Sequence, residues 1–333
     1  YWIMTGRVST FVAEFAPRRI LMAQHFYYLD PMFLLMMCLL GGGAMYFCSR
    51  PSTSRFMDWV RDLGIDLCLT FEFVYKQPAD PRDAENDLQV AWLFGLTKES
   101  HADFERRFGT TAREVYGMTE TSANLYVPRD HDHMVGSGSC GIPAPFRQVR
   151  IMGEDGREVP VGEVGELWVK GPGLMQGYYD KPEANAESLT DGWFHTGDLF
   201  RRDEAGYHYI VGRIKDMVRR SGENISAREV EAALRNMPEI EEAAVVPVPD
   251  PVSGEEVKAY VSLMPGFERA AVPPERILAH CAEHLARFKV PRYIAYRDSF
   301  PMTVSARVEK KRVIAEAGDL RADSYDRVDG VWR

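Results

Sequence analysis

The sequence of 333 residues lacks three features that would place it in a special class of proteins. Its five cysteines include no Cys-x-x-Cys pair, so we expect neither a disulfide framework nor a structural zinc site. We expect instead that the cysteines are reduced and that the protein is cytoplasmic. Its most apolar stretch, residues 31–40, is far shorter than the about 20 residues that cross a bilayer and predicts a buried element instead of a transmembrane segment. Lys and Arg number 40 against 49 Asp and Glu, and this net charge of −9 argues against nucleic-acid binding.

The remaining composition is that of a globular chain, with 45% hydrophobic and 27% charged residues. Over residues 1–126, helices are predicted to alternate with strands. Apolar residues recur at helical spacing over 54–63 and 98–108, and short strands are expected at 65–71 and 113–116. Alternating strands and helices favour a mostly parallel sheet, so this part is predicted to be a partial α/β domain.

Residues 127–214 show a different pattern. Short strands are predicted at 149–151, 166–170 and 208–211, and they are separated by turns rich in glycine and proline. This pattern indicates a small antiparallel or barrel-like β-subdomain.

Residues 215–333 are predicted to form a compact α+β domain. Ser226 and Glu229 have the spacing of a capping box, which predicts a helix start, and Pro238 is expected to end that helix. The other predicted elements are strands at 243–248, 257–263 and 291–296 and a helix at 275–285.

Three segments carry residue types that suit a nucleotide site. The run from Tyr116 to Glu120 offers an aromatic face for a base, Gly117 for close approach to a phosphate, a hydroxyl and a carboxylate. In a predicted loop over residues 191–198, Asp198 could accept ribose hydroxyls, and basic residues over 212–224 could contact an anion. Each segment alone is more often a plain turn, a capping aspartate or a solvated surface.

Together, the order and spacing of these segments resemble the adenylate-forming superfamily, which includes acyl-CoA synthetases, luciferases and peptide-synthetase adenylation domains. Residues 165–167, Gly171 and residues 177–179 match a further segment of that family. The aromatic run 26–28 and the triple glycine 41–43 look like the flanks of an acyl-CoA synthetase acyl site.

The resemblance implies an ATP-dependent, AMP-forming ligase that joins a carboxylic acid to coenzyme A through an acyl-adenylate, with Mg²⁺ as cofactor. It also lends a role to each matching position. Tyr116 and Ile210 would contact adenine, Gly95 and Gly117 would lie in the nucleotide-binding loops, and Thr119 would contact the AMP phosphate. Glu120 would bind Mg²⁺, and Asp198 and Arg213 would bind the ribose. Lys215 would act as a hinge, and Gly222 would lie beside the pantetheine of CoA.

The sequence departs from the family pattern in three places. No Thr/Ser/Gly-rich phosphate loop is found, and Thr5-Gly6 is too short to be one, so we expect the chain to be the C-terminal part of a longer synthetase. Arg307 stands where the family has a catalytic Lys, in Thr303-Val-Ser-Ala-Arg307. Of the residues usual in the family's adenine loop, only Gly95 is present within residues 94–99.

These departures leave two alternatives open. The chain could be a non-catalytic remnant that binds nucleotide or CoA, or an adenylation domain that serves a carrier protein. The identity of the carboxylic acid is not readable from the sequence.

Overall fold

The computed structural model describes residues 2–94, 96–303 and 308–333. The chain divides into two compact units. The first unit contains residues 1–196 and 200–210, and the second contains residues 197–199 and 211–333. Gly95 and Arg307 lie outside the described residues.

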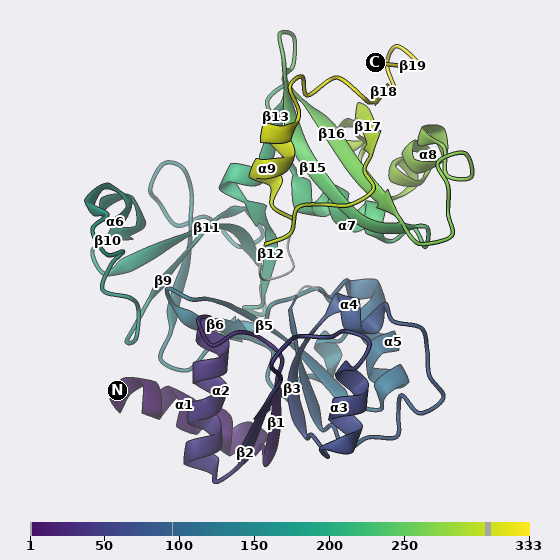
Figure 1. Ribbon diagram of the computed structural model, residues 1–333. Coiled ribbons are helices and arrows are strands. Elements are labelled where there is room, and N and C mark those ends of the chain that lie inside the picture. Colours follow the sequence, from purple (N-terminus) through teal and green to yellow (C-terminus); the bar gives the residue numbers. More distant parts are fainter. Residues whose placement is uncertain (1, 95, 304–307) are drawn as a thin grey trace. The chain divides into compact units, whose positions relative to one another are not determined.

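A seven-stranded sheet with the strand order β2-β1-β3-β4-β5-β6-β7 forms the centre of the first unit. Strands β2, β1, β3, β4 and β5 are parallel, and β6 and β7 are antiparallel additions next to β5. Figure 1 shows the sheet with its helices. The elements are α1 (Trp2–Phe15), β1 (Arg19–Met22), α2 (Leu29–Gly41), β2 (Ala44–Phe47), α3 (Phe56–Asp62), β3 (Leu67–Phe71), α4 (Glu72–Tyr75), β4 (Val90–Phe94), α5 (Lys98–Phe108), β5 (Thr111–Met118), β6 (Ser122–Tyr126), the short 3-10 helix η1 (Asp132–Met134) and β7 (Ile142–Pro143).

Side-chain alternation along the strands explains why helices cover both faces of this sheet. In β3, Leu67 and Leu69 pack with α1 and α2, whereas Cys68 between them packs with α3 and α5 on the opposite face. Parallel strands that are buried on both faces consist of consecutive apolar residues, and such runs can be recognised in the sequence. The predicted parallel sheet is therefore confirmed.

The predicted helices of this unit are present, with shifts at their ends. The helix over residues 98–108 has the predicted bounds and stops at Gly109, whose φ of 62° places it in the left-handed region. The predicted helix 54–63 is shortened to α3. The apolar stretch 31–40 lies in α2, but it is buried on one face only, since Leu39 is 69% exposed.

A five-stranded sheet forms the β-rich part, with the order β10-β11-β9-β8 and β12 paired to β11. Its elements are β8 (Gln148–Met152), β9 (Gly165–Lys170), α6 (Pro182–Ser188), β10 (Leu189–Thr190), β11 (Trp193–Arg202) and β12 (His208–Arg213). The prediction of a loop over residues 191–198 is wrong from residue 193 onward, because β11 begins there and continues past Asp198. The alternating buried pattern of β11 was obscured by the polar residues within it.

His208 in β12 makes the stability of the first unit depend on pH. Its side chain is buried and both ring nitrogens lack a partner among the described residues. Burial lowers the pKa of His208 to about 4 from an ordinary 6.5. As pH falls below 6.5, His208 is therefore protonated in the unfolded chain but stays neutral in the folded chain. The free energy of unfolding decreases as a result, until His208 is also protonated in the folded chain at about pH 4.

We expect this histidine to remove about 2 kcal/mol of stability between pH 7 and pH 5. Urea unfolding of the unchanged chain and of His208→Gln at both pH values measures the effect. The variant should be less sensitive to pH over this interval, and an equal sensitivity in both proteins would contradict the prediction.

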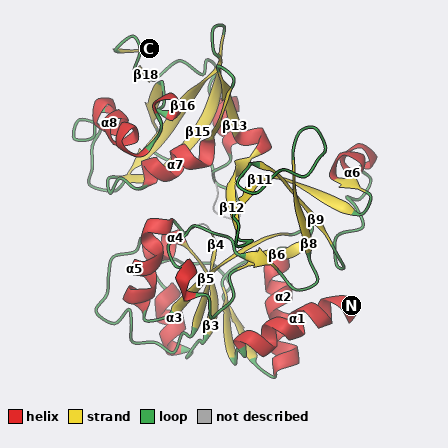
Figure 2. Cartoon of the chain, turned by 180° about the vertical axis from the view of Figure 1, so that it is seen from behind, coloured by secondary structure: helices red, strands yellow, loops and turns green. Residues whose placement is uncertain are grey.

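The second unit is built on a mixed sheet with the order β14-β13-β16-β17-β18-β19, to which β15 adds by pairing with β16. Helices α7 and α8 pack on one face of this sheet (Figure 2), and α9, labelled in Figure 1, packs on the other. The elements are the 3-10 helix η2 (Ile214–Asp216), β13 (Met217–Arg220), β14 (Glu223–Ser226), α7 (Ala227–Arg235), β15 (Ile240–Asp250), β16 (Gly254–Leu263), α8 (Pro274–His284), the 3-10 helix η3 (Arg287–Lys289), β17 (Tyr293–Tyr296), α9 (Lys310–Glu316), β18 (Tyr325–Asp326) and β19 (Val331–Trp332).

The capping box of α7 is confirmed in its main contact. The Ser226 side chain accepts a hydrogen bond from the backbone N–H of Glu229, and Val230 and Leu234 of the same helix are fully buried. The helix ends at Arg235, earlier than the predicted Pro238. In the described part of the chain, no helix is long and apolar enough to cross a membrane.

Candidate functional site

The hairpin of β5 and β6 carries the first predicted motif. Tyr116 lies at its base, 9% exposed, with its ring 4.8 Å edge-on from that of Phe200, and Ile210 packs against the same cluster. Thr119 and Glu120 lie in the turn that joins the two strands, where Thr119 is exposed. The structure thus brings Tyr116 and Ile210 to one cluster and places Thr119 and Glu120 at the end of the same hairpin.

Gly117 has a structural reason to be glycine. The pairing of β5 with β6 shifts register between Tyr116 and Gly117, and a Cβ at Gly117 would lie 2.7 Å from the carbonyl oxygen of Ser122. Real Cβ contacts are not this short, so any larger residue would push the strands apart. Close approach of the two strands therefore requires this glycine whether or not a phosphate binds nearby.

Glu120 is held from outside the hairpin by Tyr178. The Tyr178 hydroxyl donates to Glu120 Oε1 at 2.9 Å, and the Met175 N–H donates to the Glu120 carbonyl at 2.8 Å. Burial, together with the neighbouring Glu120 carboxyl, raises the pKa of Tyr178 to about 12, so it remains a donor at neutral pH. Asn185 fixes Tyr178 in turn, because its side-chain amide bonds both the N–H and the carbonyl of that residue.

Arg147 supports the same turn from the other side. Its side chain is buried and donates to the carbonyl oxygens of Thr121 and, at 2.8 Å, Pro172. Sequence reasoning missed the supporting roles of Arg147 and Tyr178. The match at residues 177–179 pointed to the segment that holds Tyr178, but no local signal identified Arg147.

The second predicted motif contains an ion pair whose carboxylate is buried. Asp198, with a side chain 3% exposed, lies in β11, and Arg213 ends the paired strand β12. The Arg213 Nε lies 2.8 Å from Asp198 Oδ1, while the Arg213 side chain is 36% exposed. A carboxylate has about four acceptor positions, so it can bond further donors such as ribose hydroxyls.

The other predicted residues of the second unit lie at its surface. Lys215 is exposed in η2, and Gly222 occupies the tip of the β13–β14 hairpin. Ser221 and Gly222 both have positive φ, 52° and 84°, as a two-residue hairpin turn requires. A Cβ at Gly222 would meet no atom within 4 Å, so the backbone there is open to a ligand.

Glu120 fits one particular mode of Mg²⁺ binding. Within residues 2–94, 96–303 and 308–333, no three His, Cys, Asp or Glu side chains gather to hold a metal. Mg²⁺ is commonly held by only one or two carboxylates together with substrate phosphates and water. The donor set at the turn suits that mode, since Tyr178 bonds Oε1 of Glu120 and orients the carboxylate.

The model of the AMP-binding enzyme family matches residues 7–179, and that of the AMP-binding enzyme C-terminal domain matches residues 229–307. Feruloyl-CoA synthase from Amycolatopsis sp is 41% identical over 281 residues, which is 83% of this chain and 56% of the relative. Sulfoacetate–CoA ligase from Cupriavidus necator is 40% identical over 67% of this chain and 43% of the relative.

ATP-bound MatB from Rhodopseudomonas palustris superposes with a TM-score of 0.83 at 28% identity, covering 94% of this chain and 63% of that chain. This likeness confirms the predicted fold class. The chain spans about half the length of the curated relatives it matches. The chain belongs to the AMP-binding enzyme family, within the adenylate-forming superfamily.

Proposed function

We propose that the chain is part of an ATP-dependent, AMP-forming carboxylic acid–CoA ligase. In the first step a carboxylate oxygen attacks the α-phosphorus of ATP, the bond to the bridging oxygen breaks, and pyrophosphate leaves. In the second step the CoA sulfur attacks the acyl carbon, AMP leaves with the bonding electrons, and the thiol proton passes to solvent. The observation that carries this proposal is the 41% identity to feruloyl-CoA synthase over 83% of the chain.

The nucleotide contacts are proposed for residues of the two motifs. Tyr116 and Ile210 would contact adenine, which their packing on one cluster supports, and Thr119 would bond the AMP phosphate from the exposed turn. Asp198 would accept the ribose hydroxyls while Arg213 neutralises and orients it. Burial of the carboxylate beside this cation supports the role, because charge-assisted hydrogen bonds are stronger away from water.

Glu120 is proposed to hold Mg²⁺, which would neutralise the phosphates as charge develops on the leaving pyrophosphate. Tyr178 keeps the carboxylate oriented, and Arg147 keeps the turn from moving when ligands bind. Preorganisation of this kind is a main source of catalysis in phosphoryl and adenylyl transfer.

Further roles are proposed for four residues that the family resemblance identified. Lys215 would be the hinge between two domains, Gly222 would line the path of the CoA pantetheine, Gly95 would border the adenine, and Arg307 would bridge carboxylate and α-phosphate. Cys38, Cys68 and Cys281 are buried free thiols, which supports a reducing, cytoplasmic setting for the reaction.

The test is to incubate the chain with ATP, Mg²⁺, CoA and a panel of short, aromatic and long-chain acids. We expect AMP and thioester in equal amounts for at least one acid. ADP as the nucleotide product, or acyl transfer to an amine but not to CoA, would contradict the proposal. A chain that binds AMP but releases no pyrophosphate would favour the alternative of a nucleotide- or CoA-binding remnant.

Arg307→Lys is expected to raise pyrophosphate release about tenfold or more. A lysine ammonium is a point charge on a flexible stem that can reach two oxygens, whereas the arginine fork prefers one planar partner. Tenfold corresponds to 1.36 kcal/mol in the barrier. Thioester formation from supplied acyl-AMP is the internal control and should change much less. A slower Arg307→Lys variant would show that Arg307 is adapted to its substrate.

A further inference from the structure

The second unit contains a segment, residues 303–307, whose two flanks are fixed close together. Met302 and Val308 form an isolated antiparallel bridge, and the Glu309 N–H donates to the Pro301 carbonyl oxygen at 2.8 Å. The residues between the bridged pair include Arg307, which is proposed to bridge the carboxylate and the α-phosphate. We call them the Arg307 segment. Its place on the second unit therefore depends on the residues that anchor its flanks.

Lys310 begins α9, two residues after the bridge that closes the Arg307 segment. A lysine in the first turn of a helix is unfavourable, because the helix dipole places partial positive charge there. The first turn of α9 contains no acidic residue that would offset this charge. The position of Lys310 is therefore explained by a partner outside its own helix.

Glu231 of α7 is that partner. Lys310 Nζ lies 2.6 Å from Glu231 Oε1, and the same oxygen accepts a hydrogen bond from the Val245 N–H of β15 at 2.8 Å. The side chains of Lys310 and Glu231 are 20% and 10% exposed, so most of this ion pair is away from water. A buried carboxylate needs a cation or donors beside it, and the pair therefore holds the start of α9 against α7 and β15.

Lys310 also reaches the segment that contains the proposed hinge. Its Nζ lies 3.9 Å from Oδ2 of Asp216, the residue that follows Lys215 in η2. The Asp216 side chain is 32% exposed, so this longer contact is weaker than the one with Glu231. One ammonium group thus links the residues that follow the Arg307 segment to α7 and to the segment of Lys215.

We propose that Lys310 is a positioning residue for adenylation: its ion pair with Glu231 fixes the Arg307 segment on the second unit, and its contact with Asp216 ties that segment to the hinge. This inference rests on the proposed function and adds a residue to which the family resemblance assigned no role. A charged group stabilises a transition state well only when it is held in place beforehand. Loss of the anchor should therefore slow the half-reaction that uses Arg307 and spare the other.

Lys310→Gln tests this role, and Lys311→Gln is its matched control, because Lys311 is the next residue of α9 and is exposed. Pyrophosphate release is measured in single turnovers without CoA, with the most active acid of the panel, over a range of ATP concentrations. We expect the maximal rate constant to fall about ten- to a hundredfold in Lys310→Gln, since small displacements of a reacting group have effects of this size. The half-saturating ATP concentration and thioester formation from supplied acyl-AMP should change less than about twofold. Lys311→Gln should leave all three quantities unchanged.

Three further variants separate positioning from a general loss of structure. Lys310→Arg keeps the charge and should restore most of the rate of pyrophosphate release, and Glu231→Gln should slow it as much as Lys310→Gln does. Since the two side chains act as one unit, the double variant Glu231→Gln/Lys310→Gln should be no slower than either single variant. Equal losses in both half-reactions, or no rescue by Lys310→Arg, would mean that the pair only supports the fold and would overturn the proposal.

Hydrogen exchange followed by mass spectrometry tests the anchor without catalysis. Local opening should be more frequent without the ion pair, so amide exchange over residues 214–216 and 308–313 should be about tenfold faster in Lys310→Gln than in Lys311→Gln. Equal exchange in the two variants would overturn the proposal whatever their activity. Failure of the ligase proposal is distinguishable, because the unchanged chain would then release no pyrophosphate with any acid. The role in adenylation would fail with it, whereas faster exchange in Lys310→Gln would still establish the anchor.

Discussion

An Asp198→Asn variant is expected to bind AMP ten- to a hundredfold more weakly than the unchanged chain. Asparagine keeps the size of the side chain in β11 but loses the charge and one acceptor oxygen. Hydrogen bonds to a charged group contribute about 1.5–3 kcal/mol each, and one such bond to a ribose hydroxyl accounts for the expected loss. The Asp198 side chain is 3% exposed, so water compensates little for the missing bonds.

Isothermal titration calorimetry with AMP measures this effect, and Asp203→Asn is its matched control. Asp203 belongs to the turn between β11 and β12, and its carboxylate accepts bonds from the Tyr209 hydroxyl and the Tyr207 N–H. It therefore has a similar structural role near the same strands but no proposed ligand. Thermal unfolding should show that both variants fold. Unchanged affinity in Asp198→Asn, or an equal loss in both variants, would refute the ribose assignment.

Local signals in the sequence predicted local structure well. The capping box at Ser226 and the apolar spacing over residues 98–108 depend on neighbours three or four positions away, and both helices begin close to the predicted residue. The strand β11 was missed where polar residues interrupt its pattern, since the paired strands that bury it are distant in sequence. The spacing of apolar residues thus predicts an element when its pattern is local. It fails when pairing with a strand distant in the sequence determines the element.

The residues of the candidate site also fall into those that the sequence predicted and those that it did not. Tyr116, Glu120 and Asp198 were predicted from their residue types, and the family resemblance attaches a role to each position. The supporting role of Arg147 was not found, since its partner Thr121 is 26 residues away and no local pattern links them.

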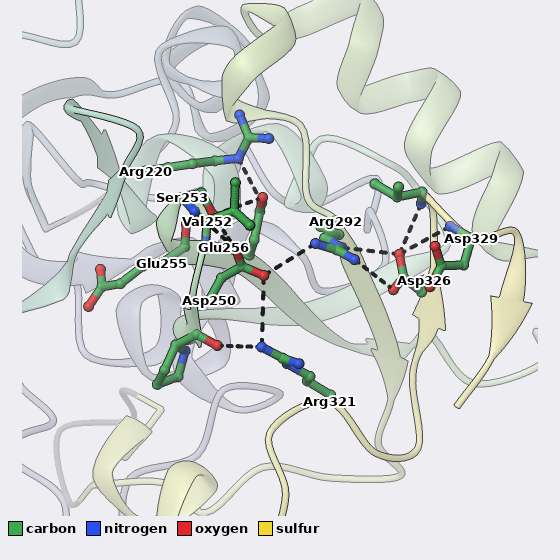
Figure 3. Close-up of polar contacts among 12 residues, drawn as sticks. Arg220, Asp250, Val252, Ser253, Glu255, Glu256, Arg292, Arg321, Asp326 and Asp329 are labelled. Carbon is green, nitrogen blue, oxygen red and sulfur yellow. Dashed lines mark hydrogen bonds and ion pairs between the residues drawn. The ribbon is translucent and has the colours of Figure 1, made fainter.

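Near the end of the chain, Asp326 forms ion pairs that could not be predicted from neighbouring residues. Figure 3 shows the guanidinium of Arg292 between Asp250 and Asp326 of β18, which follows Arg292 by 34 residues. The Asp326 side chain is fully buried, and it accepts bonds from Arg292 at 3.2 and 3.3 Å, from Arg333 at 2.7 and 2.9 Å, and from the Val328 N–H at 2.9 Å. Hydrogen bonding to these cations lowers the pKa of Asp326 to about 2, although burial alone would raise it. The strand pair β18–β19 is therefore tied to β17 through one carboxylate.

Replacing this carboxylate is expected to cost about 3 kcal/mol in the stability of the second unit. In Asp326→Ala the Arg292 guanidinium, 18% exposed, loses its main partner and keeps Asp250 at 3.4 Å. Removing one member of a buried ion pair typically costs about 3–5 kcal/mol, and the remaining partner places the expectation at the lower end. Urea unfolding followed through Trp332, the one tryptophan in residues 211–333, measures the change.

The pH dependence of this loss separates the charge from simple packing. The folded pKa of Asp326 is about 2 and the ordinary value is 3.8, so its charge stabilises the fold above pH 3.8 and ceases to do so as pH falls through 3.8 towards 2. The difference between Asp326→Ala and the unchanged chain should therefore be largest near neutral pH and shrink over that window. Asp329→Asn is the control, because Asp329 pairs with the same Arg333 but has a side chain 47% exposed, and exposed pairs contribute at most about 1 kcal/mol. A loss in Asp326→Ala that does not vary with pH would mean that side-chain packing, and not the ion pair, holds the end of the chain.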